Sequence, residues 1–222
     1  MDEDYVKNLE RIIQGMLTPL KDIPFPLVIK AISGHEVIPF DDGKTQDVRL
    51  LKLIEQSVVD AGQMMIKNGV YARRVNEIGN AIEPFVHDSL IKFGLNAKTP
   101  VDRNGKKQAM GYPDLSINFE DRTHYIECKT YNRETENTSQ RSFYLSPSDK
   151  FKVVETGHHF LVSYEMERLG SMGSKGDRYK PLYWKILSLE KLLVNVKYEF
   201  NTDNKGLYGV GKGLILKEGT LV

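Results

Sequence analysis

The spacing of apolar residues predicts two substantial helices in the first third of the chain. Residues 2–17 alternate charged and apolar groups at helical spacing. From about Gln46 to Lys67, apolar residues recur three or four positions apart, and Gly69 follows as a stop signal. The apolar face of this longer helix consists of Leu50, Leu51, Ile54, Val58, Ala61 and Met65. Prolines punctuate the segment between the two helices.

A third helical stripe precedes a series of predicted strands. It covers residues 79–94, with Ile82, Val86, Leu90 and Phe93 on one side and Gly94 as the stop. Pro84 falls inside this stripe, where a proline removes a backbone hydrogen bond. We expect the helix to restart or to kink there, and either outcome leaves Glu83 at a helix end.

Alternating apolar and polar residues predict a β-hairpin next. Residues 115–119 read as one strand, 120–122 as a turn, and 124–128 as the antiparallel return strand. Because side chains alternate between the faces of a strand, Glu127 and Lys129 share a face and Cys128 points into the core. We expect the hairpin to place Asp114 opposite Lys129, with Glu127 one same-face step away.

The remaining pattern completes an α/β fold with a central mixed β-sheet flanked by helices. Ser146 to Asp149 form a helix-start signal that predicts a short helix through about Glu155. Residues 158–164 and 183–187 read as strands, 170–178 as a mobile loop, and 189–193 as the start of a short helix. His158 and His159 face opposite ways on their strand, so hydrogen-bonded histidines are expected here instead of zinc ligands.

Composition indicates one elaborated domain in a reducing compartment. The 222 residues are 40% apolar and carry a formal net charge of +1, which indicates no overall DNA-binding field. Basic groups confined to a cleft remain compatible with that charge. The single cysteine precludes an internal disulfide and fits a cytoplasmic location. No signal peptide and no apolar run of membrane-spanning length are visible.

The candidate chemistry lies on the predicted hairpin. Asp114 follows Pro113, and an apolar run twelve residues further on ends in Glu127-Cys128-Lys129. Carboxylate oxygens are the hard ligands that Mg²⁺ prefers, and a neighbouring lysine can orient or help to deprotonate a metal-bound water. A solvated charge pair on an exposed strand is the alternative for either part alone. The strand, turn and strand context favours a hydrolytic site.

Pro113-Asp114, Glu127 and Lys129 together resemble the signature of the PD-(D/E)xK nuclease superfamily, and within it are most similar to type II restriction endonucleases. The resemblance implies a restriction-endonuclease-like core whose Mg²⁺ is held by Asp114, Glu127 and the backbone carbonyl of Cys128. It also implies a helix carboxylate facing the metal, directly or through water. Glu83 occupies that place, and Glu77 is the rival.

The same resemblance implies an overall organisation and a reaction. Residues 1–222 would form one nuclease domain, with an accessory dimerisation or DNA-embracing layer over about 1–70, a catalytic core over about 71–200, and a C-terminal hairpin or tail over 201–222. In-line attack would leave 5′-phosphates and 3′-hydroxyls on double-stranded DNA. A palindromic site would require a homodimer with a matching two-fold axis.

A polar loop follows the predicted catalytic strand and suits base recognition. Asn, Gln and Arg side chains contact adenine and guanine edges, while Ser and Thr reach bases or phosphates. A solvated loop is the alternative, and Lys175 and Arg178 further along could contact phosphates. The candidate DNA-binding residues are Tyr131, Asn132, Asn137, Ser139, Gln140, Arg141, Lys175 and Arg178.

Other functions are less compatible with the sequence. Residues 206–212 satisfy the first part of a Walker A loop, but Gly213 replaces the required hydroxyl residue and too little chain follows, so no nucleotide cofactor is expected. A structure-selective nuclease, such as a junction resolvase or a repair endonuclease, would share the carboxylate and lysine pattern. A DNA-binding module without catalysis is the non-enzyme alternative.

Overall fold

The computed structural model describes residues 2–18, 20–73, 77–107, 111–132, 134, 143–146 and 150–196. The chain separates into two compact units, residues 24–193 and the two ends, 1–23 with 194–222. Helix α1 (Glu3–Met16) lies in the second of these units, where the Asp2 side chain caps it by accepting the Asp4 N–H. This helix confirms the prediction for residues 2–17. In the same unit Val196 N donates to Leu20 O.

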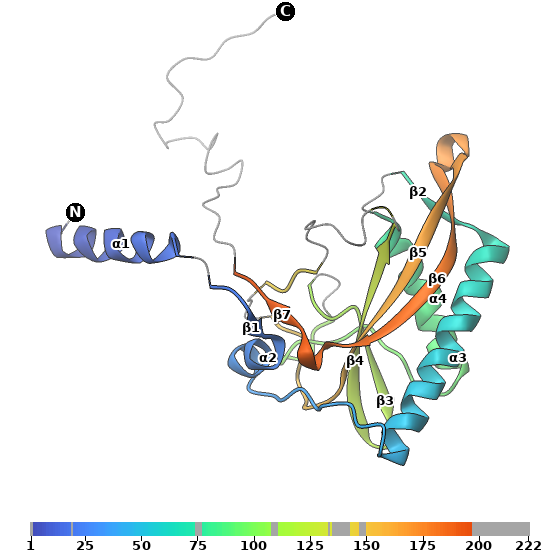
Figure 1. Ribbon diagram of the computed structural model, residues 1–222, viewed down its shortest axis with the longest axis horizontal. Coiled ribbons are helices and arrows are strands. Elements are labelled where there is room, and N and C mark those ends of the chain that lie inside the picture. Colours follow the sequence, from blue (N-terminus) through green and yellow to red (C-terminus); the bar gives the residue numbers. More distant parts are fainter. Residues whose placement is uncertain are drawn as a thin grey trace, which may run out of the picture. The chain divides into compact units, whose positions relative to one another are not determined.

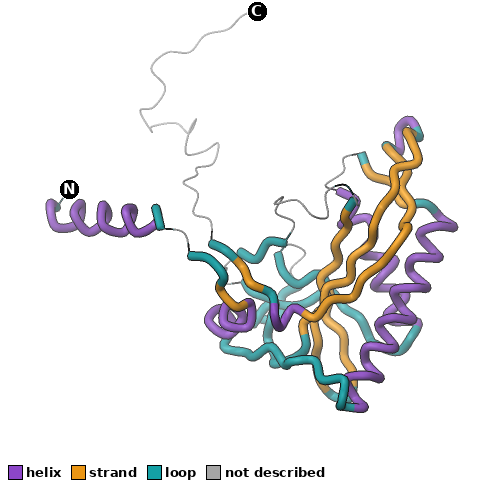
Figure 2. The backbone as a smooth tube through the Cα atoms, in the orientation of Figure 1, coloured by secondary structure: helices purple, strands orange, loops and turns teal. Residues whose placement is uncertain are grey.

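Five strands form the mixed sheet of the larger unit, as predicted (Figure 1). The order is β2-β6-β5-β4-β3, and β4 pairs antiparallel with β3 and parallel with β5. Figure 2 shows the strands curling around one another. The bounds are β2 (Val70–Ala72), β3 (Leu115–Phe119), β4 (Arg122–Tyr131), β5 (His159–Ser171) and β6 (Asp177–Ser188). A separate two-stranded sheet joins β1 (Ile23–Pro24) and β7 (Leu193–Val194).

Two helices cover one face of this sheet. Helix α3 (Thr45–Asn68) buries the apolar residues expected from its sequence, except Leu51, which is half-buried, and Gly69 ends it with a φ of 78°. Helix α4 (Ile78–Lys92) packs beside it. The even-numbered residues Ile126 and Cys128 of β4 lie in the main core together with the buried apolar residues of both helices. The predicted burial of Cys128 is thereby confirmed.

The opposite face carries a smaller core. Helix α2 (Phe25–Ser33), for which the apolar pattern gave no prediction, contributes Phe25 and Ile29. Prolines at the start of α2 are compatible with helix because its first N–H groups need no intrahelical partner. These residues pack with Tyr112, Tyr125, Val153 and Leu189. The odd-numbered positions of β4 therefore face α2.

Several element predictions are wrong in detail. Residues 150–155 form no helix. The Val154 and Glu155 N–H groups donate to the Tyr125 hydroxyl (both 3.0 Å), which competes with helical hydrogen bonding. The loop expected over residues 170–178 is shorter than predicted, because β5 runs to Ser171 and β6 begins at Asp177, with a 3₁₀ turn, η2 (Gly173–Lys175), between them. Of the short helix expected over residues 189–193, only a 3₁₀ turn, η3 (Leu189–Lys191), is present, and Leu193 already belongs to β7. None of the helices in the described parts of the chain is long and apolar enough to span a membrane.

The segment before β5 passes very close to the start of β4. A Cβ atom on Gly157 would lie 2.1 Å from the Thr123 carbonyl oxygen, which is far inside van der Waals contact. Because that oxygen belongs to a paired strand, it has no room to move. We expect Gly157→Ala to lower the free energy of unfolding by roughly 2–4 kcal/mol. Chemical denaturation would measure this loss.

Gly79 provides the matched control for that substitution. It lies in the first turn of α4, and a Cβ atom there would meet nothing within 4 Å. Gly79→Ala should raise the free energy of unfolding by up to about 1 kcal/mol, since alanine costs less conformational entropy in a helix. Equal effects of the two substitutions would contradict the close approach at Gly157.

Candidate active site

The β3–β4 hairpin sets the position of the first carboxylate. Glu120 and Asp121 form its two-residue turn, with positive φ angles of 47° and 62°. This connection pairs Leu115 with Ile126. Asp114 consequently lies beside Glu127 and Cys128, and its Oδ2 atom accepts the Cys128 N–H at 2.8 Å. The expected register, with Asp114 opposite Lys129, is wrong because the turn is shorter than predicted.

Strand β4 places the second carboxylate and the lysine on its odd-numbered face. Glu127 is 3% exposed, and its Oε1 atom accepts a hydrogen bond from Lys129 Nζ at 2.5 Å. Lys129 itself is partly open to solvent. The Glu127 Oε2 atom is buried and has no hydrogen-bond partner among the described residues. A buried carboxylate oxygen without a partner is a vacant acceptor for a proton or a cation.

Burial governs the charge of this pair. Loss of solvent and, to a lesser extent, the neighbouring Asp114 carboxylate together raise the pKa of Glu127 from 4.5 to about 7. Lys129 and Lys152 act in the opposite direction without overcoming burial. A cation bound at the free oxygen would favour the ionised form of Glu127.

Helix α4 brings a third carboxylate close to Asp114. Glu83 is half-buried in the second turn, and burial and then the Asp114 charge raise its pKa. The helix continues through Pro84, so the expectation that Glu83 would lie at a helix end is wrong. One missing N–H inside a helix packed on the core does not end it. Glu77, the rival residue, is the exposed N-cap of the same helix.

Lys152 is the residue that sequence reasoning missed. It is 2% exposed, and its ammonium group interacts electrostatically with Asp114, Glu127 and Glu83. Burial lowers its pKa, while the three carboxylates oppose that change. The available signal was a lysine inside the apolar run Phe151-Lys152-Val153-Val154, where a charged side chain needs a specific partner.

The predicted DNA-binding residues are only partly described. Tyr131 ends β4 two residues after Lys129, and Asn132 is the next residue along the chain. Asn137, Ser139, Gln140 and Arg141 lie outside the described residues, as does the side chain of Lys175 in η2, and so do residues 206–213. Arg178 pairs with Tyr71 at the far end of β6, nine positions from Leu187, which aligns with Glu127 across β5. That separation is roughly 30 Å along the strand.

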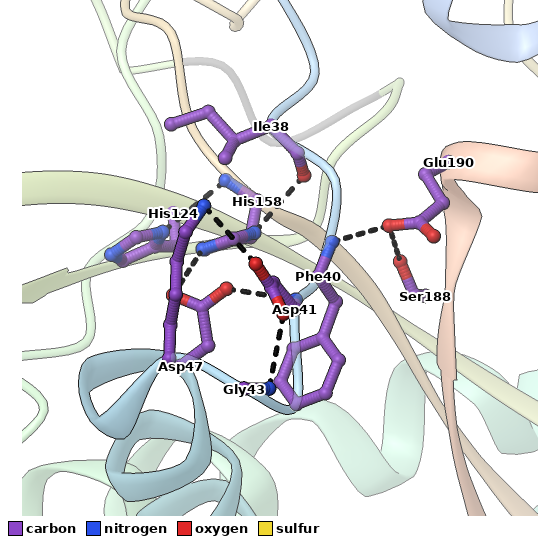
Figure 3. Close-up of polar contacts among 10 residues, drawn as sticks. Ile38, Phe40, Asp41, Gly43, Asp47, His124, His158, Ser188 and Glu190 are labelled. Carbon is purple, nitrogen blue, oxygen red and sulfur yellow. Dashed lines mark hydrogen bonds and ion pairs between the residues drawn. The ribbon is translucent and has the colours of Figure 1, made fainter.

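A buried histidine network lies where β5 begins, beside the first residues of β4 (Figure 3). His158 bonds the Ile38 carbonyl oxygen at 3.0 Å and an Asp47 oxygen at 3.3 Å, and the other Asp47 oxygen accepts the Asp41 N–H. His159 Nδ1 bonds the Tyr112 hydroxyl at 2.6 Å. Burial lowers the pKa of His159 to about 3. The prediction of hydrogen-bonded strand histidines is confirmed.

The carboxylates suit a Mg²⁺ ion that keeps some of its waters, and in the part of the chain that the structure describes they do not form a complete metal site made of protein ligands alone. Within the described ranges, no three His, Cys, Asp or Glu side chains converge tightly enough to hold a metal by themselves. Mg²⁺ commonly takes one or two carboxylates, and waters and substrate phosphates complete its coordination. Asp114 and Glu127 supply two such carboxylates, and the unpartnered Glu127 Oε2 offers a donor atom.

The curled mixed sheet, with its carboxylates and lysine on adjoining strands and helices on either side, has the restriction-endonuclease-like fold. The sequence comparisons make this assignment specific. The chain belongs to the family of the type II restriction enzyme MjaV, whose sequence model matches residues 19–211. The type II restriction enzyme MjaV of Methanocaldococcus jannaschii is 35% identical over 234 residues, covering 98% of this chain and 97% of that protein. No solved structure matches the chain. The predicted family is thereby confirmed.

Proposed function

We propose that this chain is a Mg²⁺-dependent endonuclease that cleaves double-stranded DNA at a specific sequence. The observation that carries the proposal is the carboxylate pair formed by half-buried Asp114 and buried Glu127. Asp114 is tied to the β4 backbone beside Glu127, and Glu127 retains an unpartnered oxygen and a lysine contact. Membership in a family of type II restriction enzymes supports sequence-specific cutting over branch-selective cutting.

Each side chain has a distinct role in this proposal. Asp114, Glu127 and the Cys128 carbonyl hold the metal, and Glu83 assists directly or through water. When bound, the cation supplies positive charge to the reacting phosphate. Lys129 lies in contact with Glu127, from where it orients and activates the attacking water. Attack in line with the leaving 3′-oxygen produces a 3′-hydroxyl and a 5′-phosphate.

DNA binding and assembly complete the proposal. Tyr131 and Asn132 are the nearest of the candidate DNA-binding residues to Lys129 along the chain, so we place them next to a duplex bound at the carboxylates. Asn137, Ser139, Gln140 and Arg141 follow within ten residues of Tyr131, and Lys175 and Arg178 serve as backbone contacts. A homodimer with a two-fold axis would present two such sites to a palindrome. Helix α3 packs on the catalytic sheet. Helix α1 belongs to the other unit, and we assign the dimer or DNA contacts to it.

Metal removal tests the proposal directly. We expect plasmid DNA incubated with the protein and Mg²⁺ to give discrete fragments, and EDTA to lower the rate by at least about 100-fold because the transition-state charge loses its stabilising cation. Sequencing the ends of cleaved random-sequence DNA should return one short motif with 5′-phosphates. Replacing Mg²⁺ with Ca²⁺ gives the matched binding control.

Three outcomes would contradict this function. Equal cleavage in EDTA would exclude the metal site. Cutting of branched DNA regardless of sequence would support the structure-selective alternative. A protein that binds duplexes and never cuts them, with Mg²⁺ or Mn²⁺, would be a DNA-binding module.

A further inference from the structure

Lys152 lies on the same face of the sheet as the proposed catalytic pair. The Tyr125 hydroxyl accepts the Val154 and Glu155 N–H groups, so the backbone just after Lys152 is fixed to β4. Tyr125 and Glu127 are two residues apart on the strand and therefore share a face. Val153 packs against Tyr125 in the smaller core. These contacts hold the segment that carries Lys152 over the face from which Glu127 projects.

Lys152 lies near three carboxylates without forming a direct ion pair with any of them. Its ammonium group interacts with Asp114, Glu127 and Glu83, yet it forms no hydrogen bond or ion pair with any residue in the described parts of the chain. A lysine buried solely to balance a carboxylate would pair with it directly, as Lys129 pairs with Glu127. The Lys152 ammonium is instead left with free donors near the carboxylates.

A cavity adjoins this side chain. It has a volume of about 400 Å³ and is lined in part by Lys152, Gly111 and Tyr112, the last two of which directly precede Pro113-Asp114. Lys152 thus borders open space next to the segment that leads into Asp114, although Asp114, Glu127 and Lys129 are not among the residues that line the cavity. A ligand group entering that space would meet an unpaired cation.

The balance of charges in the site indicates which ligand group the Lys152 ammonium suits. Once a divalent metal has bound, the three carboxylates are ionised, and the metal and Lys129 together only just neutralise them. A phosphodiester entering a neutral site gains little electrostatic attraction. Lys152 adds one positive charge, which leaves the loaded site with a single excess charge matching the single negative charge of a phosphodiester.

We propose that Lys152 is a second active-site lysine, one that contacts the scissile phosphodiester, while Lys129 serves the attacking water. This inference rests on the proposed function and deepens it. Lys152 stabilises the additional negative charge that develops on the phosphoryl oxygens as water attacks. Its free donors and its position beside the carboxylates suit that contact.

The test compares Lys152→Met with Lys52→Met, the same change on an exposed position of α3. Three quantities are measured for each: Mn²⁺ binding to the DNA-free protein, binding of a duplex that carries the mapped cleavage site in Ca²⁺, and single-turnover cleavage in Mg²⁺. For Lys152→Met we expect Mn²⁺ to bind several-fold more tightly, because a competing cation is gone. We expect duplex binding to weaken about 10-fold and cleavage to slow at least about 100-fold. Lys52→Met should change none of the three.

Defined results would overturn the inference. Wild-type cleavage rates in Lys152→Met would do so, and so would a loss of Mn²⁺ binding in parallel with cleavage, which indicates that Lys152 only supports the carboxylates. Thermal unfolding verifies the fold, and Lys152→Gln, which keeps a polar tip, replaces Lys152→Met if that variant does not fold. A wild type that cleaves no DNA would overturn the proposed function together with this inference, whereas a cleaving wild type with an equally active variant overturns the inference alone.

Discussion

Replacing Asp114 with asparagine is expected to abolish DNA cleavage, with a rate loss of at least about 1,000-fold. Asparagine keeps an oxygen that can accept the Cys128 N–H, so the backbone contact that fixes residue 114 persists. The substitution removes the negative charge that a divalent cation requires. Single-turnover cleavage of the mapped site in Mg²⁺ measures the loss, and thermal unfolding verifies that the variant is folded.

Asp121→Asn is the matched control. Asp121 lies on the same hairpin, is exposed, and adopts a positive φ that asparagine tolerates well. We expect this variant to cleave at the wild-type rate. Wild-type cleavage by Asp114→Asn would remove Asp114 from the site, whereas equal losses in both variants would indicate damage to the hairpin.

Glu127→Gln is expected to inactivate the enzyme and to stabilise its metal-free form at alkaline pH. Burial and the Asp114 charge raise the pKa of Glu127 to about 7, compared with 4.5 in an unfolded chain. Above pH 4.5 the unfolded state loses the proton before the folded state does, so the wild type loses stability as pH rises towards 7. Each pKa unit corresponds to about 1.4 kcal/mol, which gives about 3 kcal/mol at most by pH 8. Glutamine carries no proton to lose.

Denaturation of both proteins in EDTA at pH 4 and pH 8 measures this effect. The stability difference should be small at pH 4 and should favour Glu127→Gln at pH 8. Added Mg²⁺ should stabilise the wild type by mass action and leave the variant unchanged. Glu55→Gln, at an exposed position of α3, controls for the chemical change itself. A stability difference independent of pH would show that Glu127 ionises as it does in water.

The catalytic pair could be predicted from sequence because its geometry is local. Alternation along β4 determines that Glu127 and Lys129 share a face, and the polar residues between the two strands mark a turn. The register could not be predicted, because it depends on Glu120 and Asp121 both adopting left-handed conformations that neither residue type requires. As a result, Asp114 lies beside Glu127 instead of opposite Lys129 as predicted.

Tertiary contacts determined what local patterns could not. Residues 150–155 carry a helix-start signal, yet the Tyr125 hydroxyl, some thirty positions earlier, takes the backbone N–H groups that a helix would use. The same contact positions Lys152, so no periodicity within its own segment could reveal its role. Pro84 was expected to interrupt α4, but burial of Ile82, Val86 and Leu90 sustains the helix on both sides of it.

The two-residue turn between β3 and β4 also constrains how relatives of this chain can diverge. Residues added at Glu120-Asp121 would lengthen an exposed tip and leave the pairing of Leu115 with Ile126 intact. A single residue added between Thr123 and Ile126 would instead turn Glu127 into the main core and Cys128 onto the opposite face, where the smaller core lies. We therefore expect insertions and deletions among active relatives to accumulate at the hairpin tip, so that the number of residues separating the two carboxylates varies while the stretch leading into Glu127 keeps a fixed length.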